Sequence, residues 1–101
     1  MEAGLSAIGI GLLILAHAAD YMTFMAMVAR HGIVSEANPI VAAIAQEHGI
    51  LLLTLAKTSA VLLVASTFLV IGRTRPRIAA GVLAIGVLVG GLGAISNAAS
   101  I

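Results

Sequence analysis

Three apolar blocks, at about residues 5–28, 50–71 and 78–99, constrain the fold of this chain more than any other feature. Each is close to the roughly 20 residues that an α-helix needs to cross a hydrocarbon layer of about 30 Å. Composition agrees, because 61% of the 101 residues are hydrophobic and 9% are charged, against roughly 25% charged residues in soluble domains. We predict an all-α integral membrane bundle of three transmembrane helices, forming a single domain over residues 1–101.

The segment between the first two blocks predicts a short additional helix. Asn38 suits the N-cap position, and Pro39 suits the first helical position, where a missing N–H loses no hydrogen bond. Glu36 precedes this helix and is favourably placed for its dipole. About nine residues, 39–47, are too few to span, so we expect an interfacial helix that ends before Gly49. One bent helix with a kink at Gly49 is the alternative.

An aspartate and a lysine lie inside the apolar blocks. On insertion scales, one Asp at a helix centre costs about 2.5–3.5 kcal/mol, so such a residue suggests a functional site. Asp20 lies about nine residues below the outer end of its span, and Lys57 about eight below the outer end of the next. At 1.5 Å per residue both are roughly 12–14 Å deep. We therefore predict that they pair, with Thr23 and His17 beside them.

Several roles for this intramembrane polar cluster remain open. The pair could be a structural staple, part of a proton or ion pathway, or a ligand site. The two residues could also remain unpaired, and a neutral, protonated Asp20 is a further alternative. His17, one turn away, is more simply a satisfied buried histidine than a His-Asp relay. One histidine and one carboxylate are too few to indicate a metal site, and the chain has no cysteine. Glu36 and Asn38, with Pro39, form an extramembrane cap over the cluster or only a helix start.

The basic residues predict the orientation. Arg73, Arg75 and Arg77 lie in the turn between the second and third spans, whereas Arg30 alone lies in the first turn. The positive-inside rule then makes the second turn and the N-terminus cytoplasmic and the C-terminus external. The three arginines are also expected to contact anionic lipid headgroups. We expect residues 5–28 to be a retained span, because no Lys or Arg precedes them as in a signal peptide.

The third block carries a face of small residues. Gly86, Gly90 and Gly93 recur at helical spacing, and Asn97 extends the same face. Glycines in membrane helices permit close backbone approach, so this face is expected to pack against another helix, of the same chain or of a neighbour. Three short helices bury little surface. A homo-oligomer or a complex with other membrane subunits, within the lipid bilayer, is therefore expected.

The polar residues of the first two spans follow a recognisable pattern, namely Asp20-x-x-Thr23, Gly32, Glu36-Ala37-Asn38-Pro39 and Lys57. In this pattern the chain resembles a widespread family of small bacterial and archaeal membrane proteins with no assigned function. The pattern covers about half of the chain. The resemblance implies that these polar residues form one site, and it supplies no substrate or reaction.

The function expected from the sequence is a structural or accessory subunit of a membrane assembly, cellular or viral. A small channel, holin-like or proton-translocating protein is the alternative. A membrane-embedded enzyme using Asp20 or Glu36 as acid or base is a weaker one, because the sequence contains no G-x-S-x-G, H-E-x-x-H or Walker motif. No cofactor is indicated. A formal net charge of +1 offers no field for nucleic acid.

Overall fold

A computed structural model of the protein describes residues 3–32 and 39–101. Three long helices make up the described part of the chain, α1 (Ala3–His31), α2 (Pro39–Gly72) and α3 (Pro76–Ala99). Each contains a segment long and apolar enough to cross a membrane, at Gly4–His31, Gln46–Gly72 and Pro76–Ala99. These three candidate spans agree with the predicted all-α architecture and suggest a multi-pass membrane protein.

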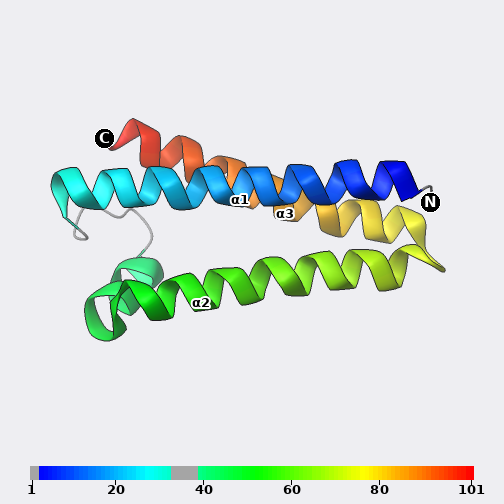
Figure 1. Ribbon diagram of the computed structural model, residues 1–101, viewed down its shortest axis with the longest axis horizontal. Coiled ribbons are helices and arrows are strands. Elements are labelled where there is room, and N and C mark those ends of the chain that lie inside the picture. Colours follow the sequence, from blue (N-terminus) through cyan, green and yellow to red (C-terminus); the bar gives the residue numbers. More distant parts are fainter. Residues whose placement is uncertain (1–2, 33–38) are drawn as a thin grey trace.

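Helix α2 is interrupted at Gly49, whose φ of 85° and ψ of 167° are not helical. A positive φ of this size is accessible to glycine but strained for residues with a Cβ. The chain therefore bends sharply here, and residues 39–48 form a short arm that turns away from the axis of the long part of α2 (Figure 1). Pro39 begins this arm, as expected for a proline at a helix start. The transmembrane part of α2 thus starts its descent near Gly49.

Helix α3 lies at the centre of the packing. It contacts both α1 and α2, whereas α1 and α2 contact each other least, although they are neighbours in sequence (Figure 1). The largest fully buried side chains are Phe68, Leu13 and Met27, and Ala79 of α3 is also fully buried. Leu13, Phe68 and Ala79 form the apolar core of the half that ends at the α2–α3 turn, whereas Met27 is buried near the opposite end of α1.

The glycine face of α3 packs within the same chain. A Cβ placed on Gly86 would lie 2.9 Å from Leu13 of α1 and 3.0 Å from Val64 of α2. A Cβ on Gly90 would lie 3.0 Å from the backbone carbonyl carbon of Ala16. Such distances are shorter than ordinary contacts, so the missing side chains are what allow α3 to approach α1 closely.

The outward faces of the helices are strongly apolar. Leucines, isoleucines and valines on all three helices are more than half exposed, among them Leu63 at 68% and Leu92 at 64%. Within the most apolar window of α2, no residue is buried inside the chain. Soluble proteins rarely present apolar area on this scale, which agrees with three helices that are long and apolar enough to cross a membrane.

The turn between α2 and α3 carries the arginine cluster. Pro76 occupies the first turn of α3, and Arg73, Arg75 and Arg77 are all exposed. The N-terminus lies at the same end of the bundle as this turn, while the C-terminus lies at the opposite end (Figure 1). The predicted cytoplasmic location of the arginine end rests on the positive-inside rule and stays a prediction.

This orientation can be tested by cysteine labelling, because the natural chain has no cysteine. We expect a membrane-impermeant maleimide to label Glu47→Cys in intact cells, since Glu47 is exposed at the end of the bundle opposite the arginine turn. Thr74→Cys should react only after permeabilisation. The reverse pattern of labelling would show that the bundle is inserted the other way round.

Candidate functional site

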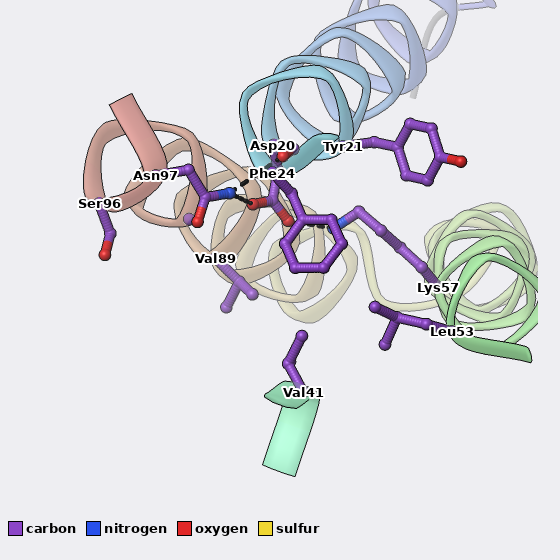
Figure 2. A pocket seen from close by; sticks show the side chains of 10 residues that line it. Asp20, Tyr21, Phe24, Val41, Leu53, Lys57, Val89, Ser96 and Asn97 are labelled. Carbon is purple, nitrogen blue, oxygen red and sulfur yellow. Dashed lines mark hydrogen bonds and ion pairs between the residues drawn. The ribbon is translucent and has the colours of Figure 1, made fainter. Parts of the chain in front are cut away.

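A single carboxylate joins all three helices. Asp20 lies on α1, Lys57 on α2 and Asn97 in the last turn of α3, and their side chains converge (Figure 2). The Lys57 ammonium forms an ion pair and hydrogen bond with Asp20 Oδ2. The Asn97 amide donates to the other carboxylate oxygen, Oδ1, at 2.9 Å. Each oxygen of Asp20 is therefore bonded to a different helix.

These polar groups are largely removed from the surface. The side chains of Lys57 and Asp20 are 25% and 20% exposed, and Asn97 is 4% exposed. Charges withdrawn from water lose their solvation, and only a close partner with further hydrogen bonds offsets that loss. Here the ammonium and the amide together take over the solvation of the carboxylate.

Thr23 and Asn97 complete the hydrogen bonding on α1. The Thr23 hydroxyl donates to the Ala19 carbonyl at 2.7 Å, which is the usual bond of a threonine within a helix. The Asn97 amide also lies 3.1 Å from the Asp20 carbonyl and 3.4 Å from Thr23 Oγ1. These two atoms and Asp20 Oδ1 all accept hydrogen bonds from the Asn97 amide. The NH₂ group of Asn97 therefore faces α1, and its carbonyl oxygen faces away.

Gly93 makes room for the carboxylate. A Cβ at this position would overlap Asp20 Oδ1 and would lie 2.7 Å from Asp20 Cγ. The carboxylate thus rests directly against the backbone of α3. Because Lys57 and Asn97 hold both oxygens, Asp20 cannot simply rotate to accommodate a larger residue.

His17 faces α3 and makes no ion pair with the residues that the structure describes. Its Nε2 lies 2.8 Å from the Gly86 carbonyl, which can only accept, so Nε2 carries a proton. Its Nδ1 is buried and has no hydrogen-bond partner among the residues described. His17 therefore ties α1 to α3 one turn below Asp20.

Tyr21 and Thr54 form a second polar bridge between α1 and α2. Their hydroxyl oxygens are 3.1 Å apart. Thr54 also lies 2.9 Å from the Ile50 carbonyl of its own helix. Together with the pair of Asp20 and Lys57, this bridge spans a gap across which the two helices otherwise make few contacts.

Two cavities flank the bridging side chains. The larger, about 610 Å³, lies among α1, α3, the long part of α2 and the short arm (Figure 2). The smaller, about 330 Å³, lies between α1 and α2 and is lined by His17 and Thr58, among others. Lys57 and Tyr21 border both cavities. The two charges that border the larger cavity, on Lys57 and Asp20, are paired with each other.

The remaining predicted residues lie away from this site or beyond the described residues. Glu36 and Asn38 of the predicted cap belong to the undescribed segment 33–38, so the cap stays a prediction. The arginine cluster lies at the other end of the bundle. Within residues 3–32 and 39–101, no group of histidine, aspartate or glutamate side chains could hold a metal ion.

Sequence reasoning missed the role of Asn97. We assigned it to the glycine packing face of α3, and it does lie there, but its amide is the third member of the polar cluster. The signal was its position four residues after Gly93, on a face that packs against the helix carrying Asp20. Tyr21 was missed as well, because one tyrosine within an apolar span has no distinctive spacing.

The chain matches the family described as "Domain of unknown function (DUF5658)" over residues 11–101. The chain belongs to this family. The DUF5658 match runs through α3, further than the polar pattern of the first two spans, and so includes Gly93 and Asn97. No curated protein and no solved structure matches the chain.

The close contact at Gly93 predicts a position-specific effect of added methyl groups. Gly93→Ala should destabilise the protein, because its Cβ would displace the Asp20 carboxylate. Gly91→Ala is the matched control, since nothing lies within 4 Å of a Cβ there, and it should be neutral or stabilising by up to about 1 kcal/mol through helix propensity. Thermal unfolding in detergent, followed by circular dichroism, measures both. Equal melting temperatures would contradict the described contact.

The ion pair predicts coupling between Asp20 and Lys57. Asp20→Asn or Lys57→Met alone should lower the free energy of unfolding by about 3 kcal/mol, because each leaves a buried charge without its partner. The double variant should lose clearly less than the sum of the two. Neutral replacements are preferred to a charge exchange, since Gly93 leaves no space for a longer side chain at position 20. Strictly additive effects would mean that the two residues do not stabilise each other.

Proposed function

We propose that this protein is a non-enzymatic structural or accessory subunit of a membrane assembly. The observation that carries the proposal is that one carboxylate receives hydrogen bonds from two other helices. The charges of Asp20 and Lys57 neutralise each other within the chain. Together with the Asn97 amide, they hold α1, α2 and α3 in register. The cluster thus acts as a staple, and the outer surface of the bundle is left to contact lipid and partner proteins.

The exposed apolar surface supports a partner for α2. No residue in its most apolar window is buried within the chain, and its large side chains, such as Leu55 and Leu63, are 55% and 68% exposed. Because lipid also covers apolar side chains, the proposed partner has to be held on this face by close packing and polar contacts. A long helix that packs on α3 along one side and exposes the rest of its surface is a suitable docking element.

A stand-alone channel is less well supported. The side chains of the polar cluster lie in one half of the bundle, at and beyond His17. In the other half, the described core consists of Leu13, Phe68 and Ala79, each at most 2% exposed. A proton or ion crossing one copy of the chain would have to pass this apolar layer without polar groups to replace water.

Site-specific photocrosslinking in native membranes tests the proposal. Leu63→Cys, labelled with a photoreactive maleimide, should form one discrete protein adduct, because this side chain lies on the exposed face of α2. Ile85→Cys on α3, at a similar exposure of 65% against 68% for Leu63, is the matched control. It should yield mainly lipid adducts.

Two outcomes would contradict the proposal. The first is lipid adducts alone at every exposed position along α2. The second is proton flux into reconstituted liposomes that disappears in Asp20→Asn, since that result would make the cluster part of a conduction pathway.

A further inference from the structure

The larger cavity has the size and position of a ligand site. Its volume of about 610 Å³ lies in the middle of the range of about 300–1,000 Å³ that is typical of small-molecule sites. All three helices contribute to its wall, and Val41 of the short arm closes one side (Figure 2). Val89, which lines it from α3, is 59% exposed. The cavity is therefore open to the surface that faces lipid.

One end of the cavity is polar and offers both donors and acceptors. Lys57 has three N–H donors, of which one is used on Asp20. The carbonyl oxygen of Asn97 points away from α1, since its NH₂ group faces the acceptors there. The Ser96 hydroxyl also lines the cavity and is exposed. A hydroxyl group, which donates and accepts at once, matches this set.

The electrostatics favour an uncharged head. The formal charges of Lys57 and Asp20 cancel, and the two groups are in direct contact. An anionic head at the ammonium would also meet the carboxylate, and a cationic head at the carboxylate would meet the ammonium. In a medium of low dielectric constant either approach is penalised, and the desolvation of the head adds to the cost.

Apart from Tyr21, the rest of the wall is apolar. Phe24, Leu53, Val41 and Val89 surround the space beyond the polar end. Figure 2 shows the Phe24 ring beside the contact between Asp20 and Lys57, with Leu53 and Val41 below the ring in this view. Hydrocarbon attached to a polar head would contact these side chains, and its tail would leave past Val89 into the bilayer.

We propose that this cavity binds an uncharged, hydroxyl-bearing lipid taken up from the bilayer. Its hydroxyl groups bind at Lys57, Asn97 and Ser96, and its first methylene groups lie between Phe24 and Leu53. The proposal goes beyond the structural role of the protein and does not depend on a partner protein, because every residue of the site belongs to this chain.

Photolabelling of the purified full chain in detergent tests the proposal. The probe is a monoacylglycerol with a diazirine in its acyl chain, and the competitors are a glycerol ester, a fatty acid and an alkylamine of equal chain length. We expect the glycerol ester to compete at a concentration at least about tenfold lower than either charged competitor, a difference of 1.4 kcal/mol. The adduct should map to peptides that line the cavity.

A matched pair of variants on α3 separates binding in the cavity from general partitioning into the detergent. Val89→Trp should fill the cavity entrance and reduce labelling at least about tenfold. Leu88→Trp is the control, because it adds the same ring at the adjacent position, whose exposure is similar at 61% against 59%. Leu88 does not line the cavity. This variant should be labelled to the same extent as the natural protein. Ser96→Ala, at an exposed position, should weaken binding about three- to tenfold through one lost hydrogen bond.

The outcomes distinguish this proposal from the proposed function. Equal competition by all three head groups, or equal labelling of the two tryptophan variants, would overturn the lipid site and leave the crosslinking result for α2 unaffected. The lipid site would be supported if the glycerol ester competes better than the charged competitors, and if labelling persists in Leu88→Trp but is lost in Val89→Trp. This result would stand whether or not a partner protein is found on α2.

Discussion

The solvation of one carboxylate in a low-dielectric layer is the constraint on which this structure depends. Asp20 cannot keep its charge in a membrane span unless protein groups replace the water it loses. The structure meets this requirement with an ammonium from α2 and an amide from α3, one for each oxygen. Because the two groups come from different helices, Asp20 is fully solvated by the protein only when all three helices have packed together. A helix that moved away would remove part of that solvation.

The glycines of α3 follow from the same requirement. Asp20 is short, so the backbone that carries Asn97 must come close to α1, and Gly90 and Gly93 permit this approach. Lys57 is long, so α2 can stand further off and still reach the carboxylate. The difference in side-chain length is consistent with the packing, in which α3 lies tightly against α1 while α1 and α2 are bridged across cavities. Packing and electrostatics thus act on the same residues.

Much of the fold could be predicted from local features. Helix length, the break at Gly49 and the turn before Pro76 depend on residue type and hydrophobic length alone. The matching depths of Asp20 and Lys57 also follow from counting residues. The contribution of Asn97 could not be obtained in this way, because helical spacing places it on a face without identifying the helix opposite that face. The rotation of each helix about its own axis is set by packing between segments distant in sequence.

The amino-acid sequence by itself determined that the chain forms apolar helices of membrane-spanning length, with opposite charges at similar depth in two of them. These properties follow from composition and from the rise of 1.5 Å per residue. Only the tertiary structure decided that α3 lies against both other helices, that its glycines face α1 within the same chain, and that a cavity of about 610 Å³ remains beside the pair. The physical reason is that side-chain shape, which selects among the possible helix rotations, acts only once the helices are in contact.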